Sequence, residues 1–424
     1  MYKIIRQNKN LIGKVTIPPS KSESNRALII QALSKNLFKI NNLSISSDTL
    51  VLEQALLKIK NHETSDEIIE IDIKDCGTAM RFLTAYLSIH KGKYLLKGTD
   101  ELNKRPVNLL VDVINIAGGK INYINKIGFP PLLIEGVNDL KNNIRINADI
   151  SSQFISALLL IAPTLKNGLS IKLENEITSK PYIDLTIEML KYFGISVIED
   201  NRTIFIPNQS YISKDIFIGG DWSSASFWFE IAILSDKVEI EIEGLNTKSI
   251  QADKVVIDIY KNLGIKTELI KKGIKLEKDN INSLNDLIFE CSLLNSPDLF
   301  PSLAVTLSAI NQKTLLKNLK NLEIKESKRL SVIIENLNNL GFYTYTINND
   351  EFINKTINFT KINKTPFKEI STYKDHRIAM SFAPLATIFD YILLDEIDIV
   401  NKSYPNYWTD LRKFGFIIEK YINE

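Results

Sequence analysis

The sequence predicts an α/β fold in which a unit of roughly 70 residues is repeated around two pseudo-symmetric domains of three units each. Three observations support this prediction. The chain has 424 residues, which is more than one hydrophobic core usually holds. An amphipathic helix that ends in glycine and leads directly into an apolar strand recurs along it. Two further helices are apolar on nearly every side, as helices inside a core are.

The helix–glycine–strand pattern occurs five times, with closing glycines 70 to 77 residues apart. A glycine just past a helix end is the expected C-cap, so the regular spacing, and not any single glycine, indicates a repeat. A sixth copy, "LVLEQALLKIKNHETSDEIIEI", comes first and lacks its glycine. The five complete copies are "DVINIAGGKINYI", "EMLKYFGISVI", "DIYKNLGIKTELI", "IIENLNNLGFYTYTI" and "DLRKFGFIIEKY", which close at Gly118, Gly194, Gly264, Gly341 and Gly415.

The two all-round apolar helices are "SSQFISALLLIAPTL" (151–165) and "SSASFWFEIAILS" (223–235). Both open with paired serines, which we expect to serve as N-caps. Such helices belong inside a core, so the sequence favours helices within each domain and strands outside them. The alternating stretch "NNDEFINKTINFTKINKT" (348–365) is typical of solvated edge strands.

Composition restricts the function. The net charge of +2 gives no reason to expect a nucleic-acid or membrane binder, so an anion site would have to come from local clustering. Two distant cysteines, Cys76 and Cys291, and three histidines argue against a disulfide framework and against a metal site. The N-terminus has no apolar leader and no segment is apolar over the roughly 18 residues of a membrane span. We therefore expect a cytoplasmic protein with reduced cysteines.

The stretch "SKSESNRAL" places cations and serines where a helix begins. Ser20 followed by Glu23 is a capping box, which needs no function. It leaves Lys21, Ser22 and Arg26 unexplained. A helix N-terminus offers N–H groups and the positive end of the helix dipole, so these side chains would also make an oxyanion or phosphate site. Taken alone, the stretch fits a cap and an anion site equally well.

Other polar turns stand beside apolar helices, and each has an ordinary structural explanation as a cap or a solvated pair. They are "DCGTAMRFLTA", "KRPV", "SSQF", "SKPYIDLT", "NSPDLFPSLAVTL", "IKESKRL", "KDHRIAM" and "NKSYPNYW". Most open a helix, one or two per repeat, so a pseudo-symmetric fold could direct them at one cleft. Eight cations would meet there: Lys21, Arg26, Arg81, Arg105, Lys325, Arg329, Arg377 and Lys402.

Eight cations in a chain of near-zero net charge imply a strongly anionic ligand or pair of ligands. Two acids, Asp298 and Glu326, would lie among them as proton-transfer groups.

The motifs and their order resemble the EPSP synthase (3-phosphoshikimate 1-carboxyvinyltransferase) family over essentially the whole chain. The matching motifs are "PSKSESNRAL", "GTAMR", "RP", "SSQF", "SKPY", "GDWSSAS", "PD", "KES-R", "DHR" and "KSYP". The resemblance implies transfer of the enolpyruvyl group of phosphoenolpyruvate to the 5-hydroxyl of shikimate 3-phosphate, with release of phosphate and no metal or organic cofactor. Each substrate carries a phosphate and a carboxylate, which fits the predicted excess of cations.

The resemblance also assigns residues. Asp298 would take the proton of the attacking hydroxyl, and Glu326 would protonate the methylene carbon, with Lys21 as a third catalytic residue. Shikimate 3-phosphate would contact Lys21, Ser22, Arg26, Ser151, Ser152, Gln153, Ser179, Tyr182, Asp298, Asn321 and Lys325. Phosphoenolpyruvate would contact Lys21, Gly77, Arg105, Gln153, Arg329, Arg377 and Lys402.

The family fold consists of two domains of three βαβαββ units, with buried helices, outer sheets and the active site in the cleft between the domains. On this chain the resemblance implies one lobe of residues 20–219 and a second, discontinuous lobe of residues 1–19 and 220–424. A monomer that closes around its substrates is expected.

Several positions depart from the family pattern. Phe82 replaces a common Pro, and Asp75 and Cys76 replace a common Asn–Ala. Ala252 stands where Gly is usual, and Lys328 replaces an acid that could support Arg329. These departures leave sensitivity to glyphosate, whose site should overlap that of phosphoenolpyruvate, open.

Two other functions remain to be separated. Enolpyruvyl transfer to UDP-N-acetylglucosamine would want a reactive cysteine on a mobile loop, and neither cysteine lies in such a setting. A non-catalytic relic that binds anions, including RNA, would need the cations but not both Asp298 and Glu326.

Overall fold

The computed structural model describes residues 1–62, 67–279, 287–356 and 369–421, and its chain divides into two compact units. Unit 1 comprises Met1–Pro19 and Gly219–Glu424, and unit 2 comprises Ser20–Ile218. Each unit has its own hydrophobic core. Among the described residues, no helix combines the length and the apolar character that a membrane crossing requires.

Four sheets share one topology, in which two parallel strands are extended by an antiparallel hairpin. In unit 2 the strands are β4 (Ile68–Asp72), β5 (Lys93–Lys97), β6 (Lys120–Tyr123) and β7 (Leu132–Glu135), then β8 (Asn143–Asn147), β9 (Leu169–Glu174), β10 (Ile198–Asp200) and β11 (Thr203–Ile206). In unit 1 they are β2 (Leu11–Thr16), β13 (Val238–Glu243), β14 (Ile265–Ile270) and β15 (Gly273–Lys278), then β16 (Phe289–Ser292), β17 (Thr314–Lys317), β18 (Tyr343–Ile347) and β19 (Glu351–Lys355). Their orders are β4-β5-β7-β6, β10-β11-β9-β8, β14-β15-β13-β2 and β16-β17-β19-β18.

Helices connect these strands and complete the repeated βαβαββ unit. The unit 2 helices are α1 (Lys21–Leu33), α2 (Ser47–Asn61), α3 (Gly77–Ile89), α4 (Asn108–Ile116), α5 (Ser152–Ile161) and α6 (Lys180–Tyr192). The unit 1 helices are α7 (Trp222–Leu234), α8 (Val256–Lys261), α9 (Phe300–Ala309), α10 (Arg329–Asn339), α11 (His376–Phe382) and α12 (Tyr407–Arg412). The prediction of an α/β fold built from a repeated unit is confirmed.

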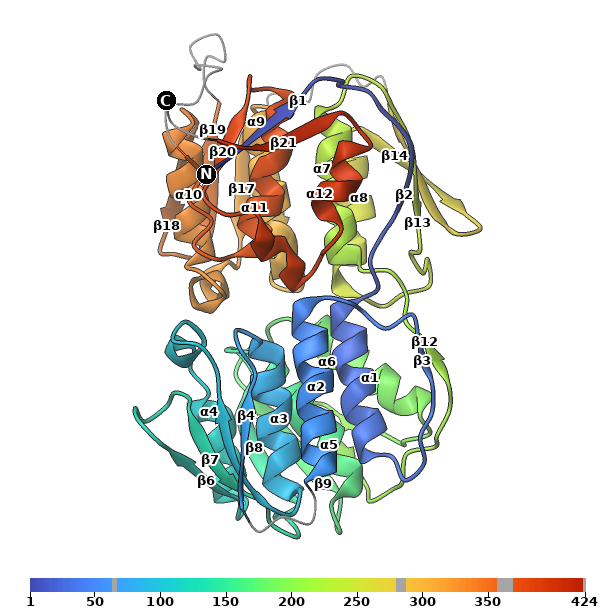
Figure 1. The fold of residues 1–424 in the computed structure, drawn as a ribbon, viewed down its shortest axis with the longest axis vertical. Coiled ribbons are helices and arrows are strands. Elements are labelled where there is room, and N and C mark those ends of the chain that lie inside the picture. Colours follow the sequence, from blue (N-terminus) through green and yellow to red (C-terminus); the bar gives the residue numbers. More distant parts are fainter. Residues whose placement is uncertain (63–66, 280–286, 357–368, 422–424) are drawn as a thin grey trace. The chain divides into compact units, whose positions relative to one another are not determined.

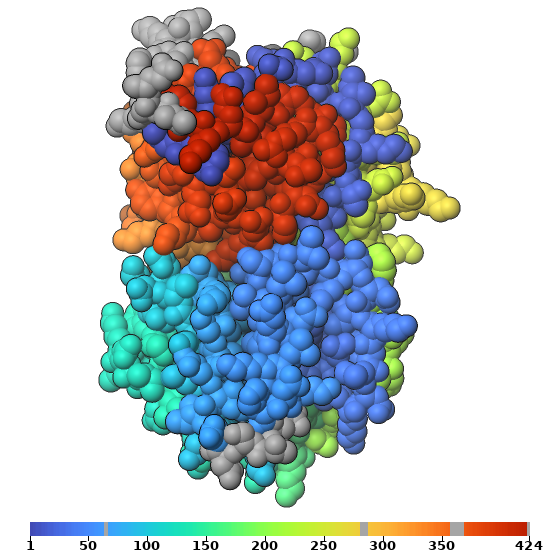
Figure 2. Space-filling view, viewed as in Figure 1, coloured from blue at the N-terminus to red at the C-terminus, as the bar shows by residue number. Residues whose placement is uncertain are grey.

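The remaining two repeats are modified. In unit 1, β20 (Ile392–Leu394), β1 (Tyr2–Arg6) and β21 (Phe416–Lys420) form a sheet in which the N-terminal strand lies between two C-terminal ones. Figure 2 shows the N-terminal residues in dark blue among the C-terminal residues in red. In unit 2, β3 (Ile40–Asn41) pairs only with β12 (Ile216–Phe217) in the part of the chain described. The first copy of the helix–strand pattern, which lacks its glycine, differs from the others in the strand that follows its helix. Its helix α2 is followed by β4, the first strand of the next sheet.

The five predicted C-cap glycines all have positive φ, between 81° and 102°. Each follows a helix and precedes a strand, which belongs to a hairpin in the first four cases and pairs with β1 in the case of Gly415. The left-handed conformation costs glycine little, so it stops the helix and turns the chain into the strand. The repeat spacing therefore reflects one local event repeated around the fold.

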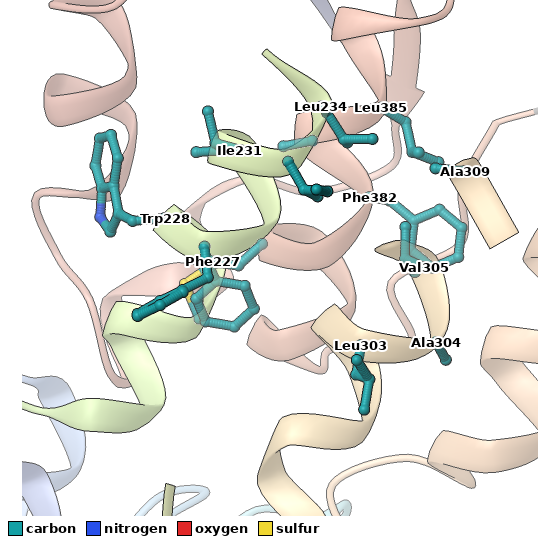
Figure 3. Packing of buried hydrophobic residues seen from close by; sticks show 14 of the residues in the cluster. Phe227, Trp228, Ile231, Leu234, Leu303, Ala304, Val305, Ala309, Phe382 and Leu385 are labelled. Atoms are coloured by element: carbon teal, nitrogen blue, oxygen red, sulfur yellow. The ribbon is translucent and has the colours of Figure 1, made fainter. Parts of the chain in front are cut away.

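The apolar helices are buried as predicted. In unit 2, α3, α5 and α1 pack on one another, and Figure 1 shows α1, α2 and α3 running side by side. Every residue of α7 is buried, and Figure 3 shows Phe227 and Leu234 of α7 in the same core as side chains of α9 and Phe382 of α11. In each unit, therefore, the helices lie inside and the sheets lie outside.

One of the two predicted serine caps is confirmed: Ser151 caps α5 by accepting from Gln153 N at 3.3 Å. Two other sequence-based details need revision. Helix α7, however, begins at Trp222, so Ser223 and Ser224 lie inside its first turn and bond to carboxylates instead of capping it. The prediction of edge strands for the stretch 348–365 is wrong for its described strand: β19 lies between β17 and β18 in its sheet. The residues from 357 onward lie outside the described chain.

Candidate active site

The start of α1 combines a helix cap with an ion pair. Ser20 Oγ accepts from the Glu23 backbone N–H at 3.3 Å, so the capping interpretation is confirmed. Lys21 Nζ lies 3.0 Å from Asp48 Oδ2, at the start of α2. Both side chains are largely buried. The cap and the cation use different atoms, so the capping box does not exclude an anion site here.

Arg26 is buried one turn further along α1. Its guanidinium donates to Thr186 Oγ1 at 2.7 Å, Ser156 Oγ at 3.2 Å, Tyr182 O at 3.1 Å and Ser22 O at 2.9 Å. Burial lowers the pKa of Arg26 to about 10, which still leaves it charged at neutral pH. These acceptors belong to α1, α5 and α6, so one cation holds the starts of three helices together.

The turn into α3 is built around a glycine that two arginines approach. A Cβ at Gly77 would lie 2.5 Å from Nη1 of Arg81 and 2.5 Å from Nη1 of Arg105. No other residue fits at this position unless these guanidinium groups move. Arg81 Nη1 also donates to Gly77 O at 2.8 Å. Two cations therefore lie against the N-terminus of α3.

Helices α5 and α6 add polar groups to the same end of unit 2. Gln153 Nε2 donates to Thr78 Oγ1 at 3.4 Å, which joins the start of α5 to the start of α3. Ser152 is the first residue of α5. Ser179 precedes α6 with φ of 54°, a strained conformation for a residue other than glycine that is often found at functional sites.

Side-chain contacts link the N-terminal ends of five helices in unit 2. They are the contacts of Lys21, Arg26 and Gln153 described above, and that of Cys76 Sγ, which donates to Asp48 O at 3.5 Å. Helix N-termini carry positive partial charge and N–H groups, and here they are accompanied by lysine and arginine side chains. This end of unit 2 is suited to bind an anion such as a phosphate.

In unit 1, each oxygen of Asp298 is held by an arginine. Arg329 Nη1 donates to Oδ1 at 3.1 Å, and Arg377 Nη2 donates to Oδ2 at 2.9 Å. Burial by itself would raise the pKa of Asp298. The charges of Arg377, then Lys325 and Arg329, outweigh burial and hold the pKa well below its usual range. Asp298 is therefore ionised at neutral pH.

Arg329 is the centre of this cluster and is 1% exposed. Its other partners are Glu326 Oε2 at 2.7 Å and Asp375 Oδ2 at 2.9 Å. Burial would lower the pKa of Arg329, but Asp375, Glu326 and Asp298 raise it above its usual value. The predicted acids Asp298 and Glu326 and the predicted cations Arg329 and Arg377 are thus brought together.

The other predicted residues of unit 1 lie in 3-10 turns. Asn321 is in η5 (Lys320–Ile324) and Lys325 ends that turn. Lys402 is buried at the end of η8 (Asp398–Lys402), which packs on α11, the helix that carries Arg377.

Several residues in these clusters escaped the sequence analysis. Asp48 pairs with Lys21, and Asp375 caps α11 by accepting from Arg377 N at 3.0 Å. Ser156 and Thr186 bind Arg26. The Asp that begins "DHR" could have been recognised as an N-cap. Nothing in the sequence relates Asp48, Ser156 or Thr186 to their partners, which are 27 to 160 residues away.

The departures from the family pattern are locally accommodated. Phe82 is buried, and the Arg26 guanidinium lies 5.5 Å from its ring centroid. Asp75 accepts from Thr99 Oγ1, and Cys76 caps α3 by accepting from Ala79 N at 3.3 Å. Lys328 is exposed, and Arg329 beside it has three carboxylate partners without an acid at 328.

Both cysteines are free thiols. Cys76 is buried at the start of α3, and burial raises the pKa of the Cys291 thiol in β16. A raised pKa disfavours the nucleophilic thiolate. In the described part of the chain, no group of three or more His, Cys, Asp or Glu residues could hold a metal ion.

A sequence profile of EPSP synthase (3-phosphoshikimate 1-carboxyvinyltransferase) matches residues 5–411. The chain belongs to the EPSP synthase family. A 3-phosphoshikimate 1-carboxyvinyltransferase of Bacteroides fragilis strain YCH46 is 39% identical over 408 residues, covering 96% of each chain. The enzyme of that name from Tolumonas auensis is 32% identical over 429 residues, covering 96% of this chain and 97% of its own.

Solved structures confirm the EPSP synthase fold. EPSP synthase from Acinetobacter baumannii superposes with a TM-score of 0.77 at 22% identity, covering 99% of each chain. The enolpyruvyl transferase NikO from Streptomyces tendae superposes with a TM-score of 0.70 at 14% identity, covering 99% of this chain and 98% of its own. The βαβαββ repeats described above are therefore the fold of this family.

Proposed function

We propose that this chain transfers the enolpyruvyl group of phosphoenolpyruvate to the 5-hydroxyl of shikimate 3-phosphate, and that residues of both units act on the two substrates. The reaction class follows from membership of the family over residues 5–411 and from relatives that align over 96% of the chain. The observation that carries the assignment of roles is the pair of charged clusters, one in each unit, each of which contains residues that match the family motifs.

Shikimate 3-phosphate binds mainly at the helix N-termini of unit 2. Arg26 and Lys21 supply charge, and the remaining contacts come from the starts of α1, α5 and α6: Ser22, Ser151, Ser152, Gln153, Ser179 and Tyr182. Oriented N–H groups and buried cations favour a phosphate and a carboxylate over neutral sugars. Asp298, Asn321 and Lys325 complete this subsite from unit 1.

Phosphoenolpyruvate is held by cations of both units. Gly77 allows Arg105 to approach the start of α3, where Gln153 contacts Thr78, and Lys21 adds a cation from the start of α1. Arg329, Arg377 and Lys402 belong to unit 1. Arginine pairs well with carboxylate and phosphate oxygens, so these residues offset the repulsion between the two substrates.

The chemistry is an addition followed by an elimination. Glu326 gives a proton to the methylene carbon of phosphoenolpyruvate, and the cationic centre so formed is attacked by the 5-hydroxyl, whose proton passes to Asp298. The tetrahedral intermediate then loses a proton from its methyl group and expels phosphate, which restores the double bond. Arginines that bind the phosphate oxygens stabilise the charge that develops on the leaving group.

The two lobes, one of residues 20–219 and the other of residues 1–19 and 220–424, close on the substrates in a cleft that the lobes share. Bound anions offset the repulsion among the cations of the two units, which favours closure. Small-angle scattering measures this directly: adding shikimate 3-phosphate should reduce the radius of gyration. An unchanged radius at saturating ligand would contradict closure.

We further propose that the protein works as a cytoplasmic monomer. Free thiols fit a reducing compartment. Sedimentation at micromolar concentration, with and without both substrates, should give the mass of one 48.2 kDa chain. A stable dimer would contradict this part of the proposal.

Phosphate release tests the function. Wild-type protein should release phosphate from phosphoenolpyruvate with shikimate 3-phosphate and not with UDP-N-acetylglucosamine. Release with the nucleotide sugar alone would favour that rival transfer, and release with neither would favour an anion-binding relic. Asp258→Asn, at an exposed position of α8, serves as the control variant. The same assay with glyphosate measures inhibitor sensitivity.

A further inference from the structure

A carboxylate outside the motifs discussed so far is buried behind the arginine–carboxylate cluster of unit 1. Asp253 lies in the turn η3 (Ala252–Val255) and is 1% exposed. Its Oδ2 accepts from Ser223 Oγ in the first turn of α7. Its Oδ1 has no hydrogen-bond partner among the residues that the structure describes. A buried carboxylate with one oxygen unsatisfied is costly, so its charge state needs an explanation.

The backbone around Asp253 is fixed against the turn that carries Asp298. Ser296 Oγ donates to Ala252 O at 3.3 Å, and Ser296 immediately precedes η4 (Pro297–Leu299). On the other side, Gln251 Oε1 accepts from Trp222 N at 3.0 Å. These contacts hold Asp253 between the start of α7 and the Asp298 turn, where its side chain is buried.

The charged groups that face Asp253 come from three other elements. They are Asp221 before α7, Asp298 in η4 and Arg377 in α11. Lys254, in the same turn as Asp253, donates to Thr247 O and is engaged there. The charged residues of the adjacent α8, Asp258 and Lys261, are exposed.

Opposing effects place Asp253 close to its titration midpoint at neutral pH. Burial, and then the charge of Asp298, raise the pKa of Asp253 to about 7, while Arg377 and the Ser223 hydrogen bond act in the opposite direction. Asp298, by contrast, stays ionised because its oxygens are held by Arg329 and Arg377. The charge on Asp253 therefore depends on how much of the positive field of Arg377 reaches it.

We propose that Asp253 is a positioning residue that takes up one proton from solvent when phosphoenolpyruvate binds against Arg377, and so offsets the negative charge that the ligand brings. The proposal rests on the proposed function for the identity of the ligand at Arg377. A bound anion cancels the field that keeps Asp253 ionised, and the carboxylate becomes a neutral carboxyl group. Asp298, which must remain ionised to accept a proton, then has one negative neighbour fewer.

Proton uptake makes binding depend on pH in a defined way. Well below pH 7 Asp253 already carries its proton, so binding takes up little or none. Above pH 7 each bound ligand must bring in one proton, and the KM for phosphoenolpyruvate should rise by up to about tenfold per pH unit. A role limited to packing would not produce this dependence.

Asp253→Asn tests the proposal, because the amide keeps the shape of the side chain and cannot titrate. We expect the KM of wild type for phosphoenolpyruvate to rise between pH 7 and 9 and the KM of Asp253→Asn to stay level, with kcat recorded separately. Asp258→Asn, on the exposed face of α8, should follow the wild-type profile. Parallel profiles for wild type and Asp253→Asn would overturn the proposal.

Calorimetry gives a second measurement. Phosphoenolpyruvate alone is titrated into each protein at pH 7.5 in buffers with different heats of ionisation. Wild type should take up a fraction of a proton per bound ligand, and Asp253→Asn should take up less. Equal uptake by the two proteins would also overturn the proposal.

Ser223→Ala keeps the proposal testable if Asp253→Asn does not fold. Loss of the hydroxyl removes a hydrogen bond that favours the ionised form of Asp253. The rise in KM should therefore begin at a higher pH than in wild type, and an unshifted profile would count against Asp253. Wild-type protein without phosphate release would instead contradict the proposed function, so the two failures are distinguishable.

Discussion

Nζ of Lys21 lies 3.0 Å from Oδ2 of Asp48, although the two residues begin different helices, α1 and α2. A lysine at a helix N-terminus is opposed by the helix dipole. The carboxylate of Asp48 offsets this effect and fixes the direction of the lysine side chain. Cys76 Sγ also donates to Asp48 O, so the same residue connects α2 to the start of α3.

Asp48→Asn should weaken the binding of both substrates, because Lys21 loses its charged partner and its fixed position. We expect the KM values to rise about tenfold, as loss of a hydrogen bond between charged groups predicts. Steady-state kinetics with each substrate varied in turn measures this. Asp72→Asn removes a similar contact from the exposed Lys74 and should leave both KM values unchanged. Unaltered KM values in Asp48→Asn would show that the pair does not orient Lys21.

Asp298→Asn should abolish turnover while shikimate 3-phosphate binds with comparable strength. The amide cannot accept the proton of the attacking hydroxyl, whereas Arg26 and the helix N-termini of unit 2 are unaffected. Phosphate release and calorimetric titration of shikimate 3-phosphate measure the two properties separately. Full activity in Asp298→Asn would refute the role of Asp298 as the proton acceptor.

Arg329→Gln should destabilise unit 1 by about 3–5 kcal/mol, because it leaves the fully buried Asp375 without its cation. Unfolding in urea, followed by tryptophan fluorescence, measures the loss; Trp222, Trp228 and Trp408 all belong to unit 1. Arg202→Gln, at an exposed arginine of unit 2, is the matched control and should change stability little. Equal urea midpoints for the two variants would contradict the importance of this cluster.

Lys328→Glu should leave activity within about twofold of wild type, since exposed charge pairs contribute little. The change restores the acid that is usual in the family, but Arg329 already has Asp298, Glu326 and Asp375 as partners. The ratio kcat/KM for phosphoenolpyruvate is the measurement. A large gain in activity would mean that Arg329 is poorly held in the native protein.

Glu230→Gln should make unit 1 more stable at alkaline pH. Glu230 is fully buried in α7, and burial raises its pKa well above 4.5. The folded protein therefore keeps a proton that the unfolded chain loses near pH 4.5, so stability falls as pH rises from that value through the raised pKa. Melting temperatures of both proteins between pH 5 and 9 should diverge as pH rises. Parallel melting curves would show that Glu230 does not limit alkaline stability.

The repeat was predictable because it depends on local chemistry. A glycine that ends a helix and an apolar strand that follows it are neighbours in the chain, and Gly118 through Gly415 all take the expected left-handed conformation. The capping box of Ser20 and Glu23 and the burial of α5 follow from the same short-range rules. The cap of α7 was misplaced by two residues because its serines bond to acids instead, one of which, Asp253, is 30 residues away.

What the sequence determined by itself is the class of the fold and the identity of the charged residues at its helix starts, because spacing, caps and motif order are properties of neighbouring residues. Only the tertiary structure decided how these residues pair. Asp48 beside Lys21, Asp375 beside Arg329 and Asp253 behind Asp298 are separated by 27 to 46 positions in the chain. Their proximity depends on packing of whole helices, and packing determines which carboxylates remain charged.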